Sequence, residues 1–166
     1  MLMALAFVPV HDVISAYDEL TKSKFYVDHD DELCGLLDYY ESTWIGVLKR
    51  NGVDRSEPLF AIQIWNCYLS VINDELRSNN GMEGWHHSFN DLVRVSHANV
   101  AKFINVLRSQ QTLVEMKLVQ LNTGLSLPKR RLLYRNYNDR IKKIVVSYDS
   151  NNKLQFLKNI AGVLKI

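Results

Sequence analysis

Apolar residues recur at steps of three and four along most of the chain, which is the spacing of one face of an α-helix. The first stripe follows Pro9, a residue suited to a first helical turn, and ends at Leu20. Later stripes predict further helices, over residues 33–48, 62–72, 80–94, 99–122, 136–148 and 152–164. The sequence therefore predicts a mostly α protein, an irregular bundle of about six to seven helices with no substantial sheet.

Two polar segments interrupt this pattern. Residues 49–58 contain an Asn-Gly turn and close on Pro58, so they predict a loop. Gly124 is well placed to end the long helix over 99–122, and Pro128 prevents its resumption. We therefore divide the chain into a helical domain over 1–124 and a basic linker with two short helices over 125–166.

The formal net charge of +2 conceals a strong asymmetry along the 166 residues. Residues 1–48 hold two bases and nine acids, residues 49–124 hold eight bases and seven acids, and residues 125–166 hold ten bases and two acids. The chain is therefore acidic at one end and basic at the other. A basic C-terminal third is a candidate surface for a polyanion.

The two cysteines and the N-terminal segment indicate in which cellular compartment the protein is expected. Two cysteines build neither a disulfide framework nor a four-thiolate zinc site, and Cys34, beside the second apolar stripe, is expected to be a small core residue. Met1–Val8 is apolar and is expected to pack against something, but it lacks the preceding base and the cleavage site of a secretory signal. No uncharged apolar run reaches about 18 residues, so we expect an intracellular protein that does not span a membrane.

The stretch from Arg77 to Asn90 carries the densest candidate chemistry. On a helix, its apolar side would hold Met82, Trp85, Phe89 and Leu92. The neighbouring polar side would hold Asn80, Glu83, His87, Asn90 and Arg94. An acid, an imidazole, two amides and a guanidinium on one face indicate a functional site.

Plainer interpretations of these residues stay open. Asn80 followed three residues later by Glu83 also fits a capping box, and His86, between the two faces, also fits a core histidine. The spacing Glu83-x-x-His86 occurs in di-iron bundles, but those need a second copy and two further Glu. The sequence contains no second copy, so we expect no autonomous metal site.

The second candidate site is the basic run that follows Pro128. Its bases, with those of the next predicted helix, are Lys129, Arg130, Arg131, Arg135, Arg140, Lys142 and Lys143. Clustered cations release counterions when they bind a polyanion, which gives salt-dependent affinity for nucleic acid, and Tyr134 and Tyr137 would be available to stack on bases. The open alternative is a solvated helical surface with a nuclear-localisation peptide.

A family resemblance is carried by residues 77–90, which read Arg-Ser-Asn-Asn-Gly-Met-Glu-Gly-Trp-His-His-Ser-Phe-Asn. This block resembles the segment of Mutator-like element (MULE) transposases that has an Asn-Asn-x-x-Glu-x-Trp-His signature. The matching positions are Asn79, Asn80, Glu83, Trp85, His86 and Asn90. The resemblance extends from residue 5 to about 150 and includes residues 39–46 and His97-x-Asn99, although Ala98 and Ala101 replace the family's Pro and Trp.

The resemblance implies a fold and an activity that this chain would only partly contain. Such transposases are similar to retroviral integrases, in which two Asp and one Glu on an RNase H-like fold hold two divalent ions. By its place in the motif, Glu83 would be the third carboxylate. The two Asp belong to strands upstream of this chain's first residue. We therefore expect no strand transfer by the chain alone and no cofactor, Mg or Mn being bound only in an intact family member.

These observations predict a truncated, MULE-transposase-like protein that binds DNA in the nucleus through its basic C-terminal third. One alternative is a trans-acting subunit that joins or inhibits a full-length transposase, or self-associates, through the apolar N-terminus at residues 2–8. A weaker alternative is a transposon relic without function. The sequence leaves the DNA sequence recognised and the oligomeric state open.

Overall fold

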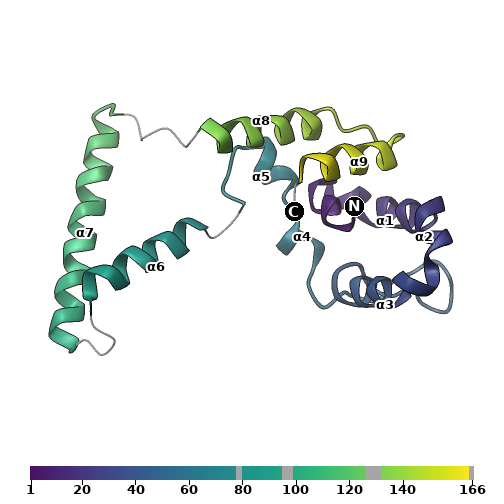
Figure 1. The fold of residues 1–166 in the computed structure, drawn as a ribbon, viewed down its shortest axis with the longest axis horizontal. Coiled ribbons are helices and arrows are strands. Elements are labelled where there is room, and N and C mark those ends of the chain that lie inside the picture. Colours follow the sequence, from purple (N-terminus) through teal and green to yellow (C-terminus); the bar gives the residue numbers. More distant parts are fainter. Residues whose placement is uncertain (78–79, 95–98, 126–131, 165–166) are drawn as a thin grey trace. The chain divides into compact units, whose positions relative to one another are not determined.

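Helices make up nearly all regular structure of the computed structural model, which describes residues 1–77, 80–94, 99–125 and 132–164. Within these ranges there is no strand, only an isolated antiparallel bridge between Leu48 and Arg55. The predicted mostly α fold is confirmed. The chain divides into two compact units, residues 1–77 with 132–166 and residues 78–131, and each is described by itself (Figure 1).

The first unit combines short N-terminal helices with the last two helices of the chain. It begins with two 3₁₀ helices and three α-helices: η1 (Leu2–Phe7), η2 (Val10–Asp12), α1 (Val13–Thr21), α2 (Lys24–Asp28) and α3 (Asp30–Tyr40). A π-helical turn and two short helices follow: η3 (Glu41–Ile45), α4 (Ile62–Trp65) and α5 (Tyr68–Ile72). The unit is completed by α8 (Leu132–Val146) and α9 (Lys153–Val163).

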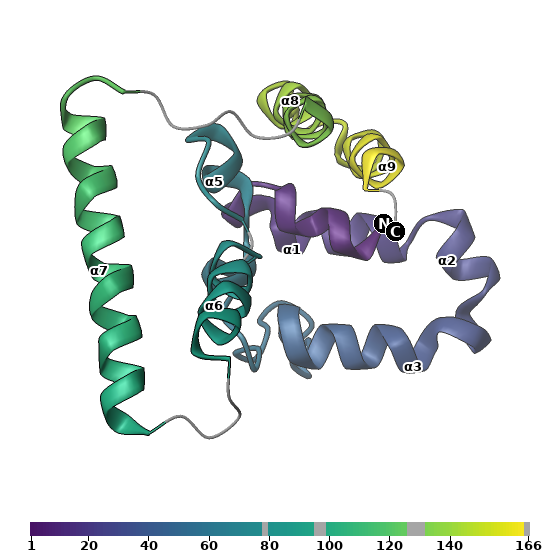
Figure 2. The same ribbon diagram turned by 60° about the vertical axis from the view of Figure 1, so that its left-hand side comes forward.

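The core of this unit joins the two ends of the chain. In Figures 1 and 2, α9 lies beside η1 and α1, and α8 lies next to α9. The apolar side chains buried between them include Leu5, Val8, Val13, Leu20, Ile141, Val145, Leu157 and Ile160. Each such side chain contributes about 2 kcal/mol on burial, so the C-terminal helices are held firmly to the N-terminal ones.

The apolar N-terminus is part of this core. This corrects the prediction that residues 2–8 are exposed and join the chain to a second protein. Leu5 and Val8 have no exposed surface, and the Cys67 backbone N–H donates to the Ala6 carbonyl at 2.6 Å. The Tyr40 hydroxyl donates to the Leu2 carbonyl. The segment does pack against something, as expected, but its partners are elements of its own chain. It is therefore not an exposed docking surface for a second protein.

Two details of the sequence prediction are wrong. The stripe that begins at Leu33 continues through Leu37 and Tyr40, which are partly buried, and Cys34 lies to one side of it. Cys34 is exposed and is not a core residue. The single helix predicted over 62–72 is two short helices, because the Asn66 amide donates to the Val8 carbonyl at 2.7 Å while its oxygen accepts from the Tyr68 N–H.

The second unit is a pair of helices, α6 (Asn80–Val93) and α7 (Val100–Asn122). Asn99 caps α7, its side chain accepting a hydrogen bond from the Lys102 N–H at 2.8 Å. Gly124 ends α7 with φ = +91°, and the N–H groups of Gly124 and Leu125 bond back to the last turn of the helix. The helix end predicted at Gly124 is confirmed.

Candidate functional site

Five of the six motif positions lie in the first three turns of α6: Asn80, Glu83, Trp85, His86 and Asn90. Glu83 lies in its first turn, where the positive end of the helix dipole favours a carboxylate. Asn80, His86 and Asn90 are exposed on the same helix. Asn79 lies outside the residues that the structure describes.

Packing fixes the apolar side of α6. Phe89 and Val93 are buried, and the Trp85 ring stacks on that of Phe89 with centroids 5.1 Å apart. The Phe103 ring of α7 meets Phe89 edge-on at 5.5 Å. Of the apolar side predicted from the sequence, only Phe89 is buried against α7. Met82, Trp85 and Leu92 are exposed, and Val93, which the prediction did not include, is buried in addition.

The polar side of α6 faces away from this contact. His87 Nδ1 lies 3.8 Å from Asp91, one turn along the helix, and both side chains are more than seven-tenths exposed. His86 is exposed, which corrects the interpretation of it as a core histidine; its ring tilts against Trp85. Both interpretations of Glu83, as a helix-capping residue and as a catalytic carboxylate, stay predictions.

A divalent ion needs several ligands close together. Over the described ranges, no three His, Cys, Asp or Glu side chains come together in a way that would hold a metal ion. A two-metal reaction needs carboxylates that bridge and flank both ions. What this arrangement offers by itself is an exposed polar helix face.

The basic candidate site falls partly on α8. This helix begins four residues earlier than predicted, so Arg135 is helical. Ile141 and Val145 bury one side of α8, and Arg135, Arg140 and Lys143 are exposed, with Asp139 among them. Lys142 is different, because its ammonium pairs with Asp74. Lys129, Arg130 and Arg131 lie outside the described residues.

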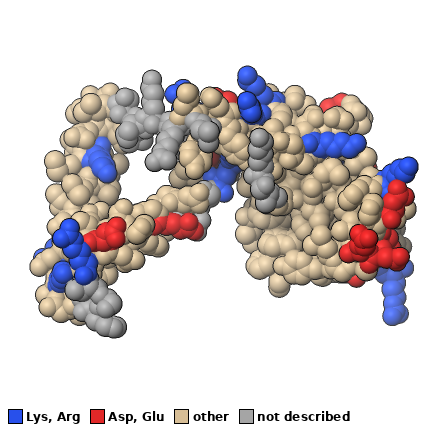
Figure 3. All heavy atoms as spheres, in the orientation of Figure 1, with Lys and Arg blue, Asp and Glu red and all other residues tan. Residues whose placement is uncertain are grey.

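Charge is distributed unevenly over the first unit. Figure 3 shows most of the acidic side chains of this face gathered at the end that holds α2 and α3, next to two basic ones, whereas separate basic side chains lie over α8 and α9. On α9, Lys153 is paired with Glu19 at 2.7 Å, whereas Lys158 is exposed. The asymmetry of charge along the sequence is therefore also an asymmetry in space within this unit.

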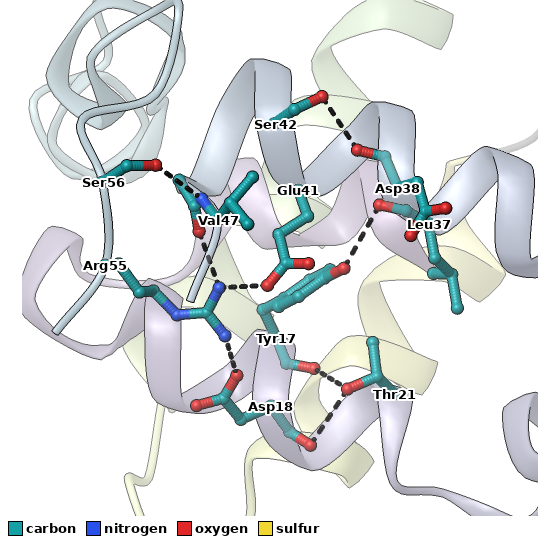
Figure 4. Close-up of polar contacts among 11 residues, drawn as sticks. Tyr17, Asp18, Thr21, Leu37, Asp38, Glu41, Ser42, Val47, Arg55 and Ser56 are labelled. Carbon is teal, nitrogen blue, oxygen red and sulfur yellow. Dashed lines mark hydrogen bonds and ion pairs between the residues drawn. The ribbon is translucent and has the colours of Figure 1, made fainter. Parts of the chain in front are cut away.

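Sequence reasoning misses a polar cluster centred on Arg55, which falls in the predicted loop. The Arg55 guanidinium pairs with Asp18 at 2.6 Å and with Glu41, and it donates to the Gly46 carbonyl at 2.7 Å (Figure 4). It also lies 5.7 Å from the centre of the Tyr17 ring. Burial lowers the pKa of Arg55, but hydrogen bonding to Glu41 and the charges of Asp18 and Glu41 outweigh burial and raise it. The cluster fastens the loop to α1 and η3.

No helix in the described part of the chain is both long and apolar enough to cross a lipid bilayer.

Comparison with protein-family models, curated proteins and solved structures found no match to this chain. The resemblance to Mutator-like element transposases therefore stays a prediction.

Proposed function

We propose that this chain binds duplex nucleic acid through a basic surface formed by residues 129–131 and the exposed side of α8. The observation that carries the proposal is the solvent side of α8, where Arg135, Arg140 and Lys143 stand opposite the buried Ile141 and Val145. Cations that packing leaves in solvent are free to contact phosphates. Each phosphate contact releases counterions, so the affinity would fall steeply with salt.

The acidic side chains give the proposed complex an orientation. The run Asp28–Glu32 contains four acids, and these lie over α2 and α3 rather than over α8 (Figure 3). A polyanion is repelled by that end of the first unit and attracted by the other. The relevant quantity is therefore the local charge near α8, not the overall charge of +2.

The test compares variants of equal net charge. Duplex DNA binding is measured by fluorescence anisotropy between 50 and 200 mM salt, for the wild type and a variant with Arg135, Arg140 and Lys143 changed to Gln. Each lost phosphate contact should reduce the slope of log affinity against log salt by about 0.9. The control changes Lys22, Lys24 and Arg50, which are exposed near the acidic end or in the 49–58 loop, to Gln.

The expected result is a weaker, less salt-dependent complex for the α8 variant and an unchanged slope for the control. Equal slopes for the two variants would mean that binding follows net charge alone, and the proposed surface would be wrong. A variant with Lys129, Arg130 and Arg131 changed to Gln reports separately on the linker. Affinity that does not fall with salt would rule out phosphate contacts altogether.

We further propose that Glu83 corresponds to the third carboxylate of the Mutator-like element transposases, and that the 166-residue chain does not cut DNA. Support comes from the motif residues that α6 carries, Asn80, Glu83, Trp85, His86 and Asn90. Mg²⁺-dependent nicking by the purified chain, abolished by Glu83→Gln, would overturn this part of the proposal.

A further inference from the structure

Helix α7 has an apolar side that its own unit leaves uncovered. None of its 23 residues, all of them described, is buried. In its first half, Phe103 meets Phe89 of α6, and Val106 and Gln110 are half-buried. From residue 111 to residue 125 every side chain is exposed, although this stretch is rich in Leu and Val.

The uncovered side follows a seven-residue repeat. Alternating steps of three and four residues connect the positions that we call the α7 seam: Ile104, Leu107, Gln111, Val114, Leu118 and Leu121. Five of these six are apolar, and a 3.5-residue period keeps such a seam facing a partner helix along its whole length. At 1.5 Å per residue, α7 is roughly 35 Å long, enough for a specific helix pair.

We propose that the α7 seam pairs antiparallel with the α7 seam of a second copy of this chain. The seam is symmetric about its middle, so a two-fold axis there brings like layers together. Ile104 would face Leu121 of the partner subunit, and Leu107 would face Leu118 of the partner subunit. Gln111 would face Val114 of the partner subunit, and its amide already donates to Glu115 of its own helix at 2.9 Å, which satisfies a polar group in the seam.

Charge complementarity selects the second copy and its direction. Arg108 and Glu115 each follow a seam position by one residue, so they border the seam on the same side. In the antiparallel pair, Arg108 lies next to Glu115 of the partner subunit, and symmetry makes this ion pair twice. In a parallel pair, Glu115 would instead border Gln110 of the partner subunit, and no opposite charges would meet.

The first test uses two substitutions matched in helix position and exposure. Leu118 is 54% exposed in the seam, and Met116 is 55% exposed on the opposite side of α7. Sedimentation equilibrium of the full chain should show a dimer with a dissociation constant in about the micromolar range. Leu118→Glu should leave a monomer, whereas Met116→Glu should keep the dimer. A wild-type monomer at 100 µM, or equal behaviour of the two variants, would overturn the proposal.

The second test reads the direction of pairing by charge reversal at low salt. Arg108→Glu and Glu115→Arg each replace two attractions by two repulsions and should weaken the dimer about tenfold. The double variant restores both pairs and should return the affinity to within about threefold of the wild type. Circular dichroism checks that each variant stays helical.

A double variant no better than the single ones would exclude the antiparallel pair. The same outcome is expected if the first unit or another protein covers the α7 seam, because neither brings Arg108 to Glu115 of a second copy. The proposal is independent of nucleic-acid binding, since the α7 seam and the basic side of α8 share no residue.

Discussion

Among the glycines of the chain, Gly46 is the one at which an added side chain would meet its surroundings most closely. It closes the η3 turn with φ = +94°, and a Cβ built on it would lie 2.0 Å from the Ser56 carbonyl oxygen. With ψ = 132°, this backbone conformation lies outside the left-handed helical region and costs an alanine about 1–3 kcal/mol. The clash adds more, because Ser56 is fixed by hydrogen bonds between its N–H and the Val47 carbonyl and between its Oγ and the Val47 N–H. We expect Gly46→Ala to lower the free energy of unfolding by about 4 kcal/mol.

Two other glycines serve as references for Gly46. Gly52 has φ = +70°, and a methyl group added to its Cα would meet nothing within 4 Å, so Gly52→Ala should cost only the conformational part, about 1 kcal/mol. Gly35 is helical within α3 and equally uncrowded, so Gly35→Ala should stabilise the first unit by about 0.5–1 kcal/mol. A loss at Gly46 well beyond that at Gly52 reflects its more restricted backbone conformation together with the close approach of Ser56.

The assay must report on the first unit alone. Trp44 and Trp65 belong to it, and Trp85 belongs to the second unit. Urea unfolding followed by tryptophan fluorescence in a Trp85→Phe background isolates the first unit. If Gly46→Ala proves no more costly than Gly52→Ala in this background, the packing argument for the loop is refuted.

Three further outcomes follow from burial and exposure. Burial raises the pKa values of Tyr17 and Tyr40 to about 12. The stabilisation from their protonated hydroxyls is therefore fully present below pH 10 and is lost as the pH rises from 10 to 12. Alkaline unfolding, followed by tyrosinate absorbance at 295 nm, should begin at a higher pH in the Tyr40→Phe variant. Cys34 is exposed, whereas Cys67 is partly buried with a pKa raised by burial, so a thiol reagent should modify Cys34 first, and Cys34→Ser should remove the fast phase. Glu83→Gln should leave the salt dependence of DNA binding unchanged in anisotropy titrations, because α8 and the linker carry the proposed phosphate contacts.

Local signals predicted those parts of the fold that are locally determined. The cap at Asn99 and the left-handed Gly124 delimit α7 through hydrogen bonds that span a few residues, and the sequence placed both ends within one residue. The mostly α class follows from periodicity, which local geometry alone sets.

Contacts between distant residues were the ones that the sequence did not reveal. The break at Asn66 depends on the Val8 carbonyl, 58 positions away, and the Arg55 cluster joins Asp18 and Glu41 across three elements. In the sequence, Arg55 is one base in a turn-rich loop and looks like any solvated side chain. The structure distinguishes it, because only 11% of its side chain is exposed. The sequence offered one signal for this cluster, a loop arginine that follows two helical acids. Many chains contain that combination, so it does not predict an ion pair.

The residues of the 77–90 block divide according to what the second unit needs in order to fold. Phe89 is accounted for by packing, since its ring meets Phe103 at the start of α7, and the Trp85 ring stacks on Phe89. Glu83 and His86 are exposed, and the contact between α6 and α7 does not depend on them. A property lost at Trp85 is therefore ambiguous between folding and function. A property lost at Glu83 with the helix pair intact belongs to function, which makes Glu83 the residue at which the transposase resemblance is best judged.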